Sequence, residues 1–256
     1  MSSDREGDVL SAVVSLVDSL LDGFDVVDLL TDLTEQCVDL LDVASSGLLL
    51  ADARGQLHLM AATSKSTEAL ELFQLQRDEG PCLDCFASGG SVSVPDLEAD
   101  SSRWPQFVPA ALASGHRSVH ATPMRAAGTV IGALGLFGSS TGALDPSDLA
   151  VADALAHVAT VAILQEKAPS PTAVRPRLRS ALSSRVVVEQ AKGYLHERLE
   201  VPLDTAFELL RLHARVEGLR LTDLARMLIS SPTDRRDIES ALSTNLADAD
   251  ARVGSE

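Results

Sequence analysis

The sequence predicts an α+β domain, built as an antiparallel sheet flanked by helices, and after it a small all-α domain of three helices. Three observations support this prediction. Between residues 8 and 167 the spacing of apolar side chains changes from helical to strand-like and back again. Three prolines, at positions 169, 171 and 176, then interrupt the pattern. Three short helical patterns follow between residues 178 and 229.

The composition is that of a folded protein with enough chain for two domains. The 256 residues are 45% hydrophobic and only 3% aromatic, and domains usually contain about 100 to 200 residues. The start of the chain, MSSDREGDVL, is polar and acidic, so we expect no secretory signal and a cytoplasmic protein. The most apolar stretch, 149–164, is interrupted by Asp153 and His157, so we also expect no membrane-spanning helix.

Charge is divided unevenly along the chain. Residues 1–168 contain 8 Lys and Arg against 24 Asp and Glu, and they carry the whole formal charge of -16. Residues 175–236 contain 12 basic and 8 acidic side chains. This asymmetry predicts two modules with different partners, and the cationic module is a candidate for binding phosphate backbones.

The first expected elements are two helices within residues 8–42. Apolar side chains recur there at helical spacing, and Gly23 divides the pattern in two. Such a repeat is compatible with a seam between the helices of a dimer, and equally with helices that pack on their own sheet. The sequence leaves both interpretations open.

The middle of the first domain predicts strands alternating with short helices. Residues 47–63 and 117–138 each contain two apolar runs around turn residues, which predicts two hairpins. Between them we expect helices at 66–76 and 104–114, a helix start at Gly80 and Pro81, and a strand at 91–94. A long helix should begin at Asp145, its N-cap, and end near residue 167.

These patterns divide the chain into five parts. We expect an N-terminal helix at 1–22, the α+β domain at 23–167, an extended proline-rich linker at 168–178, the all-α domain at 179–234, and a tail with a weak helical pattern at 235–256. The three helices of the all-α domain are expected at 178–199, 203–216 and 222–229. Gly218 is a suitable residue to end the second of them.

Beyond the linker the chain resembles the ANTAR output domain, a small three-helix RNA-binding module of transcription antiterminators. The positions that carry the resemblance are Arg185, Glu189, Gln190, Ala191, Lys192, Gly193, Ala206, Phe207, Leu210, Arg211, Ala214, Leu221, Asp223 and Ala225. Two positions, Pro202 and His196, depart from the family pattern. The resemblance implies a partner, paired hairpin loops in the leaders of nascent messenger RNA, whose binding prevents a terminator from forming.

The preceding domain resembles a GAF sensory domain, of the kind that precedes ANTAR in actinobacterial regulators. The segments that carry the likeness are EGPCLDC (79–85), SVSVPDLEAD (91–100), RWPQF (103–107), SGHRSVHATPM (114–124) and IGALGLFG (131–138). The resemblance implies control by a small-molecule or protein signal. Nothing in the sequence specifies that signal.

A protein that binds RNA loops needs cations on a rigid surface with room for unpaired bases. The first helix of the all-α domain supplies Arg185 and Lys192, which lie two turns or about 10.5 Å apart, and we expect Arg198 on the same face. Gly193 costs on the order of 1 kcal/mol relative to Ala inside a helix. This glycine therefore indicates close approach of RNA or close packing of another helix.

The candidate RNA-binding residues are Arg185, Gln190, Lys192, Gly193, Tyr194, Arg198, Arg211, Arg215 and Arg226. Arg211 is expected beside the apolar stripe of its helix, not on it. For the arginines the alternative role is a solvated surface or salt bridges to acidic neighbours. Tyr194, the one tyrosine of the chain, has two possible roles, stacking on a base and packing in the core.

A ligand pocket of the first domain would lie between the sheet and its covering helices. The candidate lining residues are His58, Met60, Ser118, His120 and Thr122. Cys82 and Cys85 form a lone C-x-x-C, which is compatible with packing, redox sensing or a metal. We favour packing and expect neither a metal nor another cofactor. With Cys37 they make an odd number of cysteines, so we expect no disulfide framework.

We find no nucleophile elbow, phosphate loop or metalloprotease motif, so we expect no catalytic residues and no enzyme. The sequence favours a dimeric RNA-binding antitermination regulator whose ANTAR-like domain is controlled by a GAF-like domain. Two alternatives remain. One is a DNA-binding transcriptional regulator, although the third helix offers essentially Arg226 alone for reading bases. The other is a ligand-binding sensory protein whose helical domain makes protein contacts.

Overall fold

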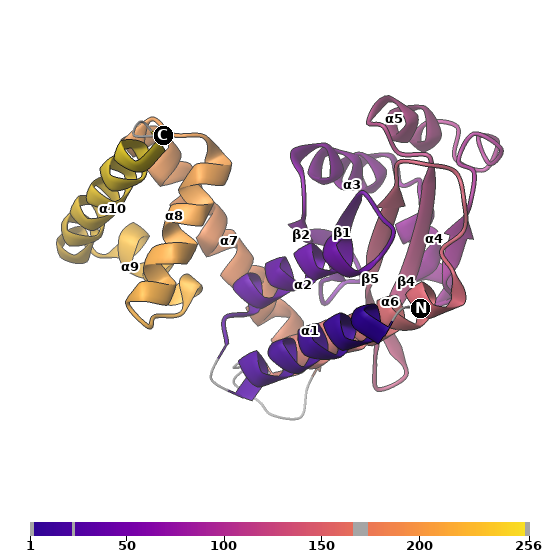
Figure 1. Ribbon diagram of the computed structural model, residues 1–256, viewed down its shortest axis with the longest axis horizontal. Coiled ribbons are helices and arrows are strands. Elements are labelled where there is room, and N and C mark those ends of the chain that lie inside the picture. Colours follow the sequence, from indigo (N-terminus) through magenta and orange to yellow (C-terminus); the bar gives the residue numbers. More distant parts are fainter. Residues whose placement is uncertain (1–2, 22–23, 166–173, 254–256) are drawn as a thin grey trace. The chain divides into compact units, whose positions relative to one another are not determined.

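The computed structural model describes residues 3–21, 24–165 and 174–253. Contacts divide the chain into two compact units, residues 1–182 and 183–256 (Figure 1). Each unit is described by itself below. The expected division at Gly23 and the residues 168–173 of the expected linker lie outside the described residues.

Two helices begin the first unit, α1 (Ser3–Leu21) and α2 (Val26–Leu40). The Asp25 carboxylate caps α2, because its Oδ1 accepts hydrogen bonds from the amides of Val27 at 2.9 Å and Asp28 at 3.3 Å. The apolar positions of α2 are buried in the unit's own core, which confirms that this half of the repeat packs on its own sheet. Helix α1 instead leaves Leu10 and Val14 exposed.

The sheet of the first unit has five antiparallel strands in the order β2-β1-β5-β4-β3. The strands are β1 (Ser45–Ala51), β2 (Leu57–Ala62), β3 (Val92–Val94), β4 (Ser118–Ala126) and β5 (Thr129–Gly138). Both expected hairpins are confirmed. Ala127 and Gly128 join β4 to β5 with φ of 49° and 79°, the left-handed conformation that a two-residue hairpin turn requires.

Helices cover both faces of this sheet. Helices α2 and α6 (Pro146–Gln165) pack on one face, and α3 (Lys65–Arg77), α4 (Pro81–Ser88) and α5 (Phe107–Ala113) pack on the other (Figure 1). On the α3/α4/α5 face, Trp104, Phe107 and Phe137 are the large side chains of a continuous apolar core. This is the α+β architecture that the sequence predicts.

Helix α6 begins as expected. Asp145 Oδ1 accepts hydrogen bonds from the amides of Ser147 at 2.7 Å and Asp148 at 3.0 Å, and Pro146 occupies the first helical position. By length and composition alone α6 could cross a membrane. Its packing is that of a core helix, because it lies against β4 and α2 and its Asp153 accepts a 2.5 Å hydrogen bond from Thr122 on β4.

The second unit contains the end of α7 (Val174–Leu199) together with α8 (Leu203–Val216), α9 (Leu221–Ser230) and α10 (Pro232–Val253). Buried side chains from all four helices form its core, among them Leu195, Leu210, Leu224 and Leu242. Helix α10 packs on α8 and α9, so the weak helical pattern of the tail corresponds to a fourth helix.

The proline-rich linker is shorter than the sequence suggests. Helix α7 begins at Val174, so residues 174–178 of the expected extended segment are helical. Pro176 lies in the first turn, where no amide is needed for an intrahelical hydrogen bond. A proline in that turn is therefore compatible with the helix.

Candidate functional site

One face of α7 in the second unit, formed by Val186, Gln190 and Gly193, is exposed to solvent, and we call it the strip. Gln190 and Gly193 are exposed, and Val186 is 55% exposed. A Cβ atom added to Gly193 would find nothing within 4 Å. Close packing of another helix of this unit therefore does not explain the glycine, which leaves approach by a ligand as the remaining interpretation from the sequence.

One carboxylate holds two candidate cations on the first flank of this strip. Glu189 Oε1 lies 2.5 Å from Arg185 Nη2, and Glu189 Oε2 lies 2.7 Å from Lys192 Nζ. The side chains of Arg185 and Lys192 are only 16% and 12% exposed. Arg185 and Lys192, which lie two turns apart on α7, therefore share one carboxylate. Glu189 holds both positive charges beside the strip.

A second glutamate, on α10, holds the other flank. Glu239 accepts a hydrogen bond from the Tyr194 hydroxyl, and its Oε2 lies 3.1 Å from Arg198 Nε. The guanidinium of Arg235 lies 5.2 Å from the centre of the Tyr194 ring. The hydrogen bond from Tyr194 lowers the pKa of Glu239, and the same bond raises the pKa of Tyr194.

The expectation that Arg198 shares a face with Arg185 and Lys192 is wrong. Arg198 pairs with Glu239, whereas the other two cations pair with Glu189. Six residues rotate an α-helix by about 600°, which leaves Arg198 roughly 120° away from Lys192. The strip is therefore flanked by cations on both sides.

The remaining candidate arginines lie on α8 and α9. Arg211 is 5% exposed, so its side chain is buried and not on an open surface, and its Nη1 lies 3.8 Å from Glu208 Oε1. Arg215 is exposed. Arg226 is 55% exposed and lies 2.9 Å from Asp223 Oδ1, as expected for a surface salt bridge.

The two departures from the ANTAR pattern have local explanations. Pro202 precedes α8 at the N-cap position, where its carbonyl still accepts the amide of Ala206 at 2.9 Å. His196 Nδ1 lies 2.6 Å from the carbonyl oxygen of Val201, which ties the end of α7 to the turn before α8. Neither change prevents the helices from forming.

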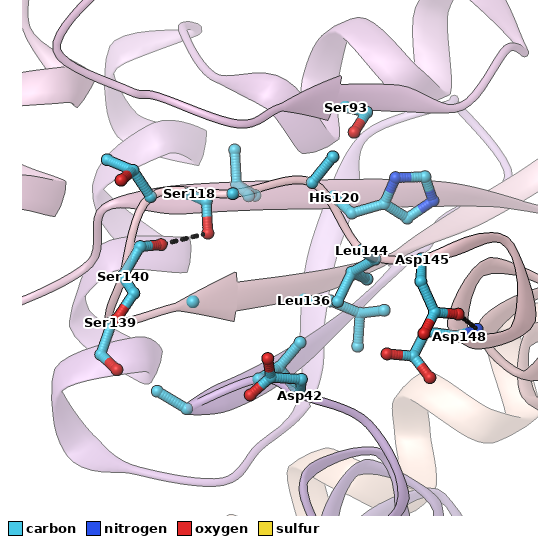
Figure 2. A pocket seen from close by; sticks show the side chains of 17 residues that line it. Asp42, Ser93, Ser118, His120, Leu136, Ser139, Ser140, Leu144, Asp145 and Asp148 are labelled. Atoms are coloured by element: carbon cyan, nitrogen blue, oxygen red, sulfur yellow. Dashed lines mark hydrogen bonds between the residues drawn. The ribbon is translucent and has the colours of Figure 1, made fainter. Parts of the chain in front are cut away.

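The first unit contains a polar hollow of about 400 Å³, which we call the β4–β5 pocket (Figure 2). It lies where β4 begins and β5 ends, beside the segment 138–145 that leads into α6. Ser118 Oγ donates a 2.8 Å hydrogen bond to the Ser140 carbonyl, which fixes this segment. Among the side chains that line the pocket are Asp42, His120 and Asp148.

The five predicted ligand-lining residues do not form one pocket. Ser118 and His120 line the β4–β5 pocket, while His58 lines a separate hollow of about 490 Å³ with Leu75 and Phe86. Met60 is fully buried, and Thr122 bonds Asp153 of α6. No local sequence pattern indicates that Asp42 and Asp148 line this pocket, and the pattern around Asp145 indicates only a helix cap, because the pocket joins segments far apart in the chain.

The cysteines of the C-x-x-C motif are buried in the α3/α4/α5 face. Burial raises the pKa of Cys85 to about 12 and that of Cys82 well above its ordinary value, so both thiols stay protonated at neutral pH. In the described part of the chain, no group of three or more His, Cys, Asp or Glu side chains is arranged to hold a metal ion. Packing is the role that this geometry favours.

A buried carboxyl group lies beside Cys82. Glu71 accepts a hydrogen bond from the Gln74 side chain, and Cys82 Sγ lies 3.7 Å from Glu71 Oε1. A Cβ added to Gly47 would lie 2.6 Å from that oxygen, and one added to Gly135 would lie 2.8 Å from Cys82 Sγ. Both glycines therefore make room for this polar cluster, and burial raises the pKa of Glu71 to about 8.

A family model of the GAF domain matches residues 25–164, more than half of the chain. The chain belongs to the GAF domain family. A model of the ANTAR domain matches residues 177–229 of this GAF protein. Both resemblances that the sequence suggests are thus confirmed, and both domains are regulatory. Helix α10, which includes Glu239, lies beyond the ANTAR match.

Several solved structures are similar to this GAF protein, at low identity. The GAF domain of a phosphoenolpyruvate-protein phosphotransferase from Acinetobacter is 16% identical and covers 63% of this chain and 94% of its own, with a TM-score of 0.48. Free methionine-R-sulfoxide reductase from Neisseria meningitidis is 20% identical and covers 72% and 96%, with a TM-score of 0.47. Scores below 0.5 say nothing about activity. A search of curated proteins gives no significant match.

Proposed function

We propose that this protein is a cytoplasmic, dimeric transcription antitermination regulator. Its ANTAR domain binds paired hairpin loops in the leader of a nascent messenger RNA, and this binding prevents a terminator from forming. Its GAF domain controls that binding in response to a small-molecule or protein signal. The proposed activity is binding alone, and we assign no residue a catalytic role.

The observation that carries this proposal is the open strip around Gly193. RNA needs a surface to which a backbone or base can come close, with cations at the sides. Gly193 leaves such a surface empty, while Arg185 and Lys192 lie on one flank and Arg198 on the other. A glycine that helix packing does not require supports the interpretation that a ligand approaches there.

Dimerisation supplies the second RNA contact. Two ANTAR domains in one particle convert binding of the second loop into an intramolecular event, which strengthens overall binding without any new contact. The exposed Leu10 and Val14 of α1 are one turn apart. We propose that they belong to the dimer seam, because the apolar side chains of α2 are already used in the core.

The test is Gly193→Ala, assayed in the full-length protein with an RNA that contains two hairpins. Alanine raises helix propensity by about 1 kcal/mol and meets no neighbour in the protein, so thermal stability should rise. RNA affinity should fall by about tenfold or more, because the added methyl group prevents the RNA from coming as close to the helix backbone as it can at glycine, and the van der Waals contacts made there are lost. Unchanged RNA affinity in the stabilised variant would contradict close approach at Gly193.

Competitors in the same assay separate the alternatives. Duplex DNA should compete weakly, because Arg226 on α9 is paired with Asp223 and base reading in the major groove needs several side chains. A matched single hairpin should bind less tightly than the paired one if the protein acts as a dimer. Preference for duplex DNA would favour a DNA-binding regulator, and no binding to either nucleic acid would favour a protein-contact role.

A further inference from the structure

Tyr194 lies between the strip and the cation on its second flank. Successive residues of an α-helix are rotated by about 100°, so Tyr194 is about 40° from Gln190 of the strip and about 40° from Arg198. The residue before it is Gly193, where an added Cβ atom would meet nothing within 4 Å. Tyr194 is half-buried, so part of it is accessible from solvent. A ligand that approaches Gly193 therefore comes close to Tyr194.

An arginine of α10 is fixed over the Tyr194 ring. Arg235 Nε donates a 2.8 Å hydrogen bond to the Leu228 carbonyl, and its Nη2 donates a 2.6 Å hydrogen bond to the Ile229 carbonyl. Both carbonyls belong to the last turn of α9, where no amide of the same helix is available to them. The guanidinium centre lies 5.2 Å from the centre of the Tyr194 ring, which is the usual range of a cation–π contact. Because two carbonyls of α9 hold the guanidinium, Arg235 is a rigid support for the ring.

A glutamate one turn further along α10 holds the edge of the same ring. Glu239 accepts a hydrogen bond from the Tyr194 hydroxyl, and residues four apart, such as Arg235 and Glu239, lie on one face of a helix. Tyr194 is therefore held by α10 both at its ring and at its hydroxyl, and its orientation is set before any RNA is bound. A side chain that is already ordered loses less conformational entropy when a partner binds.

An aromatic ring fixed beside an RNA-binding surface matches a general mode of RNA recognition, in which unpaired bases of a loop stack on aromatic side chains. Because Glu239 already occupies the Tyr194 hydroxyl, the ring is the part that remains for RNA. We propose that α10 positions Tyr194 as a platform on which one unpaired base of the hairpin loop stacks, with Arg235 and Glu239 as positioning residues. This proposal rests on the proposed function and extends the RNA-binding site beyond the ANTAR match, which ends at residue 229.

The first test observes Tyr194 directly, because it is the one tyrosine of the chain. Full-length protein that contains 3-fluorotyrosine in place of tyrosine gives a fluorine NMR signal from Tyr194 alone. The probe is an RNA with two hairpins, and each RNA of a matched set carries an abasic site at one loop position of both hairpins. We expect the intact RNA to shift the signal. One abasic RNA should abolish this shift and bind about fivefold to a hundredfold more weakly, because one stacking contact is lost.

The second test asks whether Arg235 acts through Tyr194. Arg235→Gln should weaken RNA binding by about threefold to tenfold, since the ring loses its support. Arg236→Gln removes the same charge from an exposed neighbour on α10 and should change affinity by less than about twofold. In a Tyr194→Leu background, Arg235→Gln should have no further effect, because a positioning residue is coupled to the residue that it positions. If Arg235→Gln does not fold, the abasic RNAs remain decisive because they need no variant.

Three results would overturn this proposal while RNA binding itself stands. The first is a Tyr194 signal that every abasic RNA shifts as the intact RNA does. The second is an equal loss of affinity in Arg235→Gln and Arg236→Gln. The third is an effect of Arg235→Gln that persists in the Tyr194→Leu background and makes log K against log salt less steep by about 0.7, as a direct phosphate contact would. Absence of RNA binding by the parent protein would instead contradict the proposed function, and this proposal with it.

Discussion

The hydroxyl of Tyr194 donates a hydrogen bond to the carboxylate of Glu239, which joins α7 to α10. The same carboxylate neutralises Arg198, and Arg235 from α10 covers part of the Tyr194 ring. Two of the candidate RNA-binding side chains are therefore occupied by a helix that lies beyond the ANTAR match. An RNA phosphate that contacts Arg198 has to compete with Glu239.

The first prediction concerns this competition. In Glu239→Gln, the amide oxygen can still accept from Tyr194, but the negative charge beside Arg198 is gone. We expect RNA affinity to rise by about twofold to fivefold, a modest gain because Arg198 is 61% exposed and surface ion pairs are weak. Filter binding measures the affinity. Asp237→Asn removes one exposed charge from the same helix, and an equal gain in that control would show a general charge effect.

The second prediction concerns stability as a function of pH. Burial raises the pKa of Glu71 from its ordinary value of 4.5 to about 8. Between these values the unfolded chain releases a proton that the folded chain retains, so this group makes the free energy of unfolding fall as pH rises. Below pH 4.5 both states keep the proton, and above pH 8 both lose it, so the loss is then complete.

Glu71→Gln removes this titration and serves as the matched variant. We expect its free energy of unfolding, relative to the parent protein, to increase by a few kcal/mol between about pH 5 and pH 8. Denaturant unfolding at several pH values measures the difference. Because only the change with pH matters, a constant offset from the altered hydrogen bonds does not affect the outcome. A difference that is flat with pH would mean that Glu71 does not titrate in this window.

The third prediction concerns the glycines that make room for Glu71 and Cys82. In Gly135→Ala the new methyl group would lie 2.8 Å from Cys82 Sγ and 2.9 Å from Glu71 Oε1. We expect a loss of about 1–3 kcal/mol in the free energy of unfolding, since crowding a packed core is costly. Gly90→Ala, whose Cβ would meet only Ser88 Oγ at 3.8 Å, should change stability by less than about 0.5 kcal/mol.

Local sequence patterns are sufficient for most of the fold. The turn residues Ala127 and Gly128 lie where the β4–β5 hairpin needs positive φ, and α8 has the bounds that its apolar spacing predicts. Pro176 wrongly predicts an extended segment. A proline in the interior of a helix breaks it, but a proline in the first turn is compatible with the helix. The position of Arg198 follows from helical geometry alone, and its expected place on the Lys192 face neglects a rotation of roughly 120°.

The candidate sites are less accessible to sequence reasoning. Tyr194 and Glu239 are 45 residues apart, and no local pattern in either helix indicates that they meet. Asp42 and Asp148 likewise come from opposite ends of the GAF domain and join in one pocket only through the sheet. The sequence does not distinguish Glu71 from an ordinary exposed polar residue of a helix. Only the structure, in which Glu71 packs against Gly47, reveals that it is buried.

The last prediction concerns the salt dependence of RNA binding. If Lys192 contacts a phosphate, RNA binding releases a counterion there, and log K against log salt should be less steep by about 0.7 in Lys192→Gln. Glu189 holds Lys192 at 2.7 Å and Arg185 at 2.5 Å, so Glu189→Gln should raise affinity at low salt by freeing both charges. Lys65→Gln, at an exposed position of the GAF domain, is the control and should leave the slope unchanged. A slope in Lys192→Gln equal to that of the parent protein would show that this lysine contacts no phosphate, and the flank formed by Arg185 and Lys192 would then serve the helix and not the RNA.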